Sequence, residues 1–148
     1  MIVVDTSVWI DFFRGATTPG VERFVALIDD DAGIAINDVI LTEILQGLRS
    51  EADVRRVGRR LAPFEVLRLE DLDDYRRAAS LYRGARREGI TIRRTLDCLI
   101  ASVCIREDVA LLHADADFDR LASCSTLRLA LAGRTQLRAP SISRLTGD

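Results

Sequence analysis

The stretch MIVVDTSVWIDFF, residues 1–13, decides how the rest of the chain is interpreted. Residues 2–4 predict a short buried strand, and the chain then passes at once to Asp5, Thr6 and Ser7. Such residues commonly cap the start of a helix, which is the ordinary explanation for them. A carboxylate at the end of a buried strand can also face a ligand in an α/β protein. The other acids of the chain decide between these two interpretations.

The composition indicates a single globular unit. The length of 148 residues fits one domain, and 48% of the side chains are apolar, which is enough to bury a core. No stretch approaches the roughly 20 apolar residues that a membrane helix needs. The amino end also lacks the positive flank and apolar core of an export signal. We therefore expect one domain over residues 1–148, in the cytoplasm, without a membrane segment.

Cysteine, histidine and lysine usage narrows the possible chemistry. Cys98, Cys104 and Cys124 are widely spaced, so we expect buried small side chains and not a disulfide framework. His113 is the only histidine, which argues against a structural zinc site. All 21 basic side chains are arginine, so mechanisms that require a catalytic lysine are excluded.

Short apolar stretches alternate with helical patterns along the whole chain. Strands are predicted at residues 2–4, 34–36, 109–113 and 127–131, and a strand or extended connector at 64–69. Helices are predicted at residues 8–14, 21–30, 37–49, 51–61, 71–87, 95–106 and 118–122. Short apolar strands between helices are typical of a parallel sheet that is covered on both faces. The expected fold class is therefore an α/β sandwich.

Acidic residues follow two of the predicted strands. Asp5 ends the first strand, and the strand at 109–113 runs into HADADFD, which contains Asp115 and Asp117. Ligands bind beyond the carboxyl ends of the strands in an open parallel sheet, so we expect these acids at one rim. Taken alone, Asp115 or Asp117 would be an ordinary helix cap.

Two more acids interrupt helices that are otherwise apolar. Asp97, in TLDCLIASVCI, has apolar residues on both sides of it on a helical wheel. The ordinary explanation is its place in the first helical turn, where the helix dipole stabilises an anion. Glu43, in NDVILTEILQGL, lies at the edge of an apolar arc, where a glutamate is usually just solvated. Glu43 is therefore a candidate only in combination with the other acids.

Four or five converging carboxylates would repel one another, and each would raise the pKa of its neighbours. A divalent cation resolves this conflict, and oxygen ligands suit Mg²⁺ or Mn²⁺. Such a cation can lower the pKa of a bound water and neutralise charge that develops on phosphorus. The pattern therefore favours nuclease chemistry.

Four blocks of the sequence resemble a known family in their order and spacing. They are VVDTSVWIDFF at 3–13, TEILQGLR at 42–49, TLDCLIAS at 95–102 and LLHADADFDRLA at 111–122. Together they resemble the PIN-domain ribonucleases and, more narrowly, VapC-type toxins of bacterial toxin–antitoxin pairs. The resemblance covers essentially the whole chain. It implies a PIN-like three-layer α/β/α sandwich with a central, mainly parallel sheet.

The resemblance also implies roles for particular residues. The expected catalytic acids are Asp5, Glu43, Asp97 and Asp115, and the expected metal ligands are Asp5, Asp97, Asp115 and Asp117. Asp115 is the first choice for the fourth acidic position, with Asp117 as a possible outer ligand. Thr6 and Ser7 match the hydroxyls that can orient a ligand water beside the first aspartate. Asp119 is expected to be a surface or cap residue.

The activity that the resemblance implies is endonucleolytic cleavage of RNA by a metal-activated water. The expected cofactor is Mg²⁺, with Mn²⁺ as a substitute. A cognate antitoxin is expected to hold the enzyme inactive by laying a segment over its groove, and a homodimer is usual in the family.

RNA binding at an acidic site requires basic residues nearby. Arg93 and Arg94 are the first candidates because they directly precede Asp97, although solvated ion pairs are the ordinary explanation for arginines in this chain. Trp9 and Phe12 are three residues apart on a helix and are expected to make apolar contacts, not a base-stacking platform. His113 is expected to make an ordinary strand-end hydrogen bond.

Two other functions are compatible with an aspartate at the end of the first strand. A phosphotransfer fold with an aspartate after its first strand would need a lysine that the chain lacks, and a phosphatase would need an acid where Ser7 stands. A non-catalytic PIN-like module that only binds RNA or antitoxin is the main alternative. The acids present at all four family positions argue against it.

Overall fold

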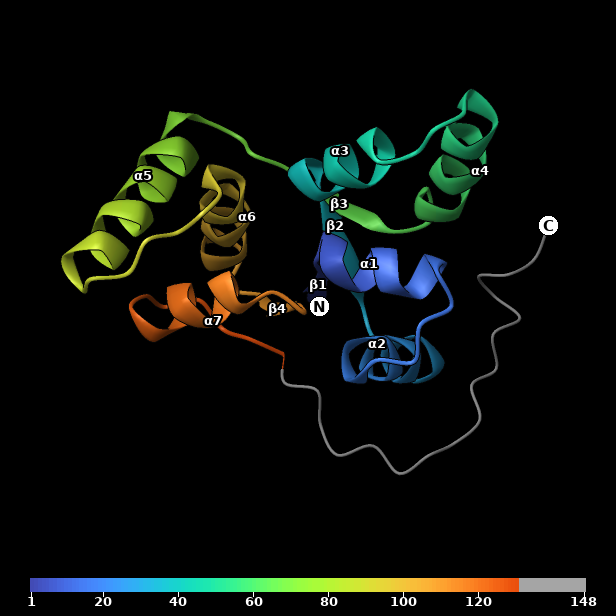
Figure 1. Cartoon of the computed structure of the whole chain (residues 1–148), viewed down its shortest axis with the longest axis horizontal. Coiled ribbons are helices and arrows are strands. Elements are labelled where there is room, and N and C mark those ends of the chain that lie inside the picture. Colours follow the sequence, from blue (N-terminus) through green and yellow to red (C-terminus); the bar gives the residue numbers. More distant parts are fainter. Residues whose placement is uncertain (131–148) are drawn as a thin grey trace.

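The computed structural model describes residues 1–130 and has a four-stranded parallel sheet at its centre (Figure 1). The strands are β1 (Ile2–Val4), β2 (Ile34–Asn37), β3 (Glu65–Leu67) and β4 (Ala110–Leu112), in the order β3-β2-β1-β4. The helices are α1 (Thr6–Phe13), α2 (Pro19–Asp29), α3 (Asp38–Gln46), α4 (Glu51–Leu61), α5 (Leu72–Arg87), α6 (Thr95–Arg106) and α7 (Ala116–Ser123). Helices α5, α6 and α7 lie on one side of the sheet, and α1 and α2 lie on the other (Figure 1). The predicted three-layer sandwich is therefore confirmed.

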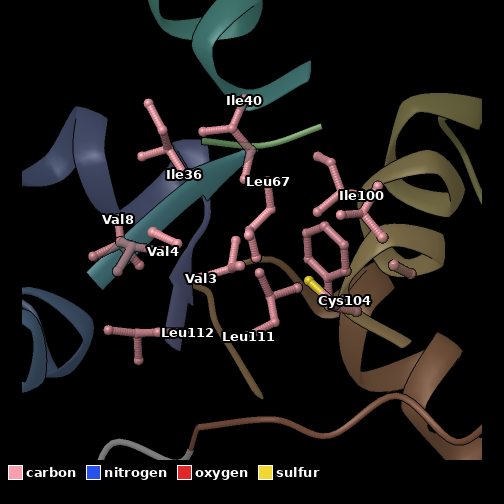
Figure 2. Packing of buried hydrophobic residues seen from close by; sticks show 14 of the residues in the cluster. Val3, Val4, Val8, Ile36, Ile40, Leu67, Ile100, Cys104, Leu111 and Leu112 are labelled. Carbon is pink, nitrogen blue, oxygen red and sulfur yellow. The ribbon is translucent and has the colours of Figure 1, made fainter. Parts of the chain in front are cut away.

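Strands β1, β2 and β4 are largely buried and almost entirely apolar, whereas the edge strand β3 begins with the exposed Glu65. Strand β1 pairs with β2 in the register Val3↔Ala35 and with β4 in the register Val3↔Leu111. Successive side chains of a strand point to opposite faces. Val3 and Leu111 thus lie toward Cys104 of α6, whereas Val4 and Leu112 lie on the other side (Figure 2).

An aromatic cluster joins α1 and α2 on the far face of the sheet from α6. Trp9 is 1% exposed, its ring stacks on Phe13, and its edge contacts with Phe24 and Phe64 are also close. Its indole Nε1 donates a hydrogen bond to the carbonyl oxygen of Val4 at 3.0 Å. The expectation of an apolar contact for Trp9 is therefore confirmed, and its ring is not available to stack on a base.

Several predicted boundaries differ from the structure for local reasons. Helix α1 begins at Thr6, not at residue 8, because the Asp5 side chain caps it by accepting from the Ser7 N–H. Helix α3 ends at Gln46 because Gly47 forms its C-cap, whereas the predicted helix ran to residue 49. Helix α7 begins at Ala116, two residues before the predicted start.

The last predicted strand, 127–131, is wrong as far as the structure describes it. Leu129 forms only an isolated parallel bridge with Leu111. Two backbone hydrogen bonds support this bridge, from Leu111 N–H to the Arg128 oxygen and from Ala130 N–H to the Leu111 oxygen. Residue 131 lies outside the described residues. The segment at 64–69, by contrast, contains the regular strand β3.

The cysteines and the helices bear on what the composition predicts. All three cysteines are free, and Cys98 and Cys104 are buried while Cys124 is half-buried. Within residues 1–130, none of the helices has both the length and the apolar character that crossing a bilayer requires.

A buried carboxylate fastens α5 to α6. Asp74 is fully buried, and its oxygens accept from Arg77 Nη1 at 2.9 Å and from the Glu70 N–H at 2.8 Å. Arg106 of α6 places its Nε 3.2 Å from the same carboxylate, and the Ser102 hydroxyl donates to the Asp74 carbonyl oxygen at 2.7 Å. Each oxygen of this side chain therefore has a partner, as a structural buried charge requires.

We expect Asp74→Ala to lower the free energy of unfolding by about 3–5 kcal/mol, because it leaves two arginines beside an empty buried site. Asp73→Ala is the matched control: this neighbour is 72% exposed and, among residues 1–130, forms an ion pair with Arg76 alone, so a change below about 1 kcal/mol is expected. Urea denaturation of both variants measures the difference. Equal losses in the two variants would contradict a structural role for the Asp74 network.

Candidate active site

The carboxyl edge of the sheet brings together the residues that follow β1 and β4. These strands are parallel neighbours, and the Asp5 N–H donates to the Leu112 oxygen at 2.9 Å. The Ser7 hydroxyl also accepts from the Ala114 N–H at 3.0 Å, which ties the start of α1 to the loop after β4. The loop that carries Asp115 therefore lies against the loop that carries Asp5.

Asp5 is buried with one satisfied and one unsatisfied oxygen. Its Oδ2 accepts from the Ser7 N–H at 3.0 Å and from the Ser7 hydroxyl at 2.6 Å. Its Oδ1 is buried and has no hydrogen-bond partner among residues 1–130. Burial raises the pKa of Asp5 above its ordinary value, although the hydrogen bonds from Ser7 lower it in part. Helix capping accounts for one oxygen only.

Glu43 reaches the same edge from α3 and is buried, with 6% of its surface exposed. Its Oε1 accepts from the Thr6 hydroxyl at 3.1 Å, and its Oε2 accepts from Arg94 Nη1 at 3.0 Å. Burial raises the pKa of Glu43, and Arg94 lowers it in part. The possibility of an ordinary solvated glutamate, left open by the sequence, is therefore excluded.

Asp97, from the first turn of α6, is the most deeply buried acid of the site. It is fully buried, its Oδ1 accepts from Arg94 Nη2 at 2.8 Å, and its Oδ2 has no partner within the described part of the chain. Burial raises the pKa of Asp97 to about 6; Arg94 lowers it, and the charges of Asp5 and Asp115 raise it further. An interaction with the helix dipole alone does not require the acid to be fully buried with an unpartnered oxygen, so the ordinary explanation for Asp97 is incomplete.

Asp115 and Asp117 have different surroundings. Asp115 Oδ2 lies 3.7 Å from Arg94 Nη2, so Asp115 shares this arginine with Asp97 and Glu43. Asp117 is held apart: its Oδ1 accepts from Arg120 and its Oδ2 from the backbone and side chain of Arg93. Although burial opposes it, these partners keep the pKa of Asp117 below its ordinary value. The structure thus brings Asp115 to the group of Asp5, Glu43 and Asp97, and directs Asp117 elsewhere.

Both candidate RNA-binding arginines contact carboxylates in this structure. Arg93 pairs with Asp117 and, at 3.4 Å, with Asp115. Arg94 lies between Glu43, Asp97 and Asp115; burial lowers its pKa, but these three acids raise it above its ordinary value. The sequence indicated both arginines only by their position shortly before Asp97, as candidates for RNA contact, and no local pattern indicated the contact of Arg94 with Glu43.

His113 makes the strand-end contacts expected of it. Its Nδ1 accepts from the Asp115 N–H at 3.0 Å, and its Nε2 lies 3.3 Å from an Asp119 oxygen. An open cavity of about 300 Å³ lies beside these residues, lined in part by His113, Asp115 and Leu129. His113 therefore holds the backbone of the loop that carries Asp115, and space for a ligand adjoins it.

The donor set fits a hard divalent cation. It consists of carboxylate oxygens, and two of them, Asp5 Oδ1 and Asp97 Oδ2, are buried without a hydrogen-bond partner among residues 1–130. No three His, Cys, Asp or Glu side chains of these residues already converge as a metal site. The residue types suit Mg²⁺ or Mn²⁺, while the guanidinium of Arg94 lies between three of the acids.

Comparison with known proteins gives agreement in sequence and in fold. The family model described as PIN domain matches residues 2–123, a range that contains every helix and strand described above. Ribonuclease VapC11 from Mycobacterium tuberculosis is 38% identical over 131 residues, which cover 88% of this chain and 98% of the relative.

Two solved structures share the fold. VapBC2 from Rickettsia felis, bound to a DNA fragment from its promoter, matches with a TM-score of 0.70 and 20% identity, and the match covers 88% of this chain and 98% of that chain. A toxin–antitoxin complex from Klebsiella pneumoniae matches with a TM-score of 0.63 and 18% identity over 80% of this chain and 90% of that chain.

The raised pKa of Asp97 predicts how stability depends on pH without metal. Its folded pKa of about 6 lies above the ordinary value of 3.8, so its contribution to stability is fully present below pH 3.8 and is lost as the pH rises through 6. Asp97→Asn removes this loss and, at 1.36 kcal/mol per pKa unit, should stabilise the metal-free protein at pH 7.5 by about 3 kcal/mol.

Thermal unfolding in EDTA between pH 4.5 and 7.5 tests this expectation. The wild-type melting temperature should fall more steeply with pH than that of Asp97→Asn. Asp73→Asn, at an exposed position, should follow the wild type. Identical pH slopes for wild type and Asp97→Asn would show that the charge of Asp97 does not strain the fold.

Proposed function

The chain belongs to the PIN-domain family, and from this premise we propose that it is an endoribonuclease, the toxin of a toxin–antitoxin pair. One observation carries the proposal: four acids from four separate parts of the fold lie at the carboxyl edge of the sheet, and two of them have buried, unpartnered oxygens within residues 1–130. The 38% identity to a ribonuclease over 88% of the chain gives the reaction class.

We propose Mg²⁺ as the cofactor, with Mn²⁺ as a substitute. Asp5, Asp97 and Asp115 would hold it, and Asp117 would act from outside, because two arginines already engage it. When bound, such a cation activates a water and neutralises charge on the phosphate. The oxygen donors are hard ligands, and burial raises the pKa of Asp5 and of Asp97; both features support this choice.

The remaining residues of the site position these acids. The Ser7 hydroxyl holds one oxygen of Asp5 and leaves the other free to bind a ligand. The Thr6 hydroxyl orients Glu43 by donating to Oε1, and Oε2 accepts from Arg94. Once Arg94 has left Oε2, the raised pKa of Glu43 would suit it to take a proton there from the attacking water. Cleavage of the phosphodiester would then need no histidine or lysine.

RNA is proposed to approach over Arg93 and Arg94, which lie at the rim of the site and are both exposed. Their side chains are 67% and 46% exposed, so each can offer donors to a phosphate. The cavity beside His113 is lined by Asp115, one of the four acids, and would offer room for a nucleotide next to the bond that is cut.

The proposed partners follow from the family. We infer a cognate antitoxin, in keeping with the similarity of the fold to a toxin–antitoxin complex. A cytoplasmic location and a homodimer are proposed for the same reason, as is a single PIN domain over residues 1–148. Light scattering on the purified chain should give twice the mass of one chain, and a monomer at micromolar concentration would contradict the dimer.

RNA cleavage tests the central proposal. Purified protein incubated with total cellular RNA and Mg²⁺ or Mn²⁺ should produce discrete cuts that EDTA abolishes. Asp5→Asn and Asp97→Asn should each lower the rate by at least about 100-fold, because each removes a ligand charge. Asp73→Asn, which changes an acid on α5 that is 72% exposed, should cut at nearly the wild-type rate.

The alternative is a non-catalytic module that only binds RNA or antitoxin. Wild type and all three variants would then leave the RNA equally intact under every metal condition, while still binding antitoxin. Metal-independent cutting that survives Asp5→Asn would contradict both functions and indicate a contaminating nuclease.

A further inference from the structure

Arg94 joins three acids that come from different parts of the fold. Its Nη1 donates to Glu43 Oε2 at 3.0 Å, and its Nη2 donates to Asp97 Oδ1 at 2.8 Å. The same Nη2 lies 3.7 Å from Asp115 Oδ2. One guanidinium therefore provides positive charge for α3, α6 and the loop after β4 at the point where their carboxylates meet.

The neighbouring arginines serve other carboxylates. Arg93 and Arg120 hold Asp117, and Arg77 and Arg106 hold Asp74 between α5 and α6. Neither Glu43 nor Asp97 has an ion pair with any arginine other than Arg94 among residues 1–130. The charge of the two most buried acids on α3 and α6 is thus offset by this one side chain.

The acids are fixed, whereas the arginine can move. The side chains of Glu43 and Asp97 are 5% and 0% exposed, but that of Arg94 is 46% exposed. Arg94 is also the N-cap residue of α6 without a side-chain cap, and its carbonyl oxygen accepts from the Asp97 N–H at 3.2 Å. The backbone therefore keeps its place when the guanidinium swings into solvent.

A guanidinium and a divalent cation cannot share these oxygens. Asp97 Oδ1 and Glu43 Oε2 are already used by Arg94, and two positive groups held at contact distance repel each other strongly in a partly buried site. An ion that draws Asp97 and Asp115 together must displace the guanidinium from between them. Each occupant lowers the affinity of the other, and this coupling is reciprocal.

We infer that Arg94 is an internal competitor of the divalent cation: its guanidinium holds Glu43, Asp97 and Asp115 in the metal-free protein and thereby sets the cation concentration at which the site fills. The inference rests on the proposed function, because it takes these acids as the metal site. Arg94 is thus a residue that tunes metal affinity through the acids that it holds.

Mn²⁺ binding to the purified full chain, followed by the electron paramagnetic resonance of free Mn²⁺, tests this without RNA. Arg94→Gln should bind Mn²⁺ roughly tenfold more tightly than wild type, within the usual range of coupling between two sites. Arg76→Gln is the matched control: it removes the same charge from a residue of α5 whose ion partner, Asp73, is exposed and is not one of the site acids. Its affinity should change less than about threefold.

Thermal unfolding adds a second readout and a check on folding. In EDTA, Arg94→Gln should melt below wild type, because Glu43 and Asp97 lose their counter-charge. Saturating Mn²⁺ should then raise its melting temperature more than it raises that of wild type. A circular dichroism spectrum like that of wild type establishes that the variant is folded.

The outcomes separate this inference from the proposed function. Equal or weaker Mn²⁺ binding by Arg94→Gln, with wild type still binding, would overturn the competitor role alone and indicate that Arg94 helps to organise the ligands. An equal gain in Arg76→Gln and Arg94→Gln would also overturn it, since net charge would then explain the effect. Failure of every variant, wild type included, to bind Mn²⁺ would overturn the metal site and this inference together.

Discussion

The parallel pairing of β1 with β4 is the constraint on which the rest of the site depends. Because the two strands run in the same direction, both end at one edge of the sheet, and the loops after them must meet there. The hydrogen bonds from Asp5 N–H to the Leu112 oxygen and from Ala114 N–H to the Ser7 hydroxyl hold the two loops together. The acids are brought close by backbone geometry, against their mutual repulsion.

That repulsion distinguishes the two kinds of buried carboxylate in this protein. Asp74, between α5 and α6, has partners for each side-chain oxygen and fastens two helices. Asp5 and Asp97 are equally buried, yet each has an oxygen without a partner among residues 1–130, and burial raises the pKa of both. The first arrangement stabilises the fold. The second stores unfavourable electrostatic energy that a bound cation can release.

Arg94 reduces this energy in part, and its place in the fold explains why it does so incompletely. It is the N-cap residue of α6, on the rim of the sheet, where about half of its side chain faces solvent. Water screens an ion pair at such a position, so one guanidinium does not offset three acids. In the proposed function, the site would therefore hold either this arginine or a metal ion, above a sheet that fixes the acids.

The sequence by itself determined the alternation of short apolar strands with helices, and it located Asp5 and Asp115 just after strands, because period and burial are local properties. It did not determine that Glu43 is buried, or that Thr6 and Arg94 reach it, since those contacts join residues 37 and 51 positions apart. It also overstated the last strand, where only Leu129 pairs with β4 among the described residues. Which acids share one arginine, and which of two neighbouring aspartates joins them, was decided by tertiary packing, because the crossing of α3 and α6 over the sheet edge leaves no periodic trace in the chain.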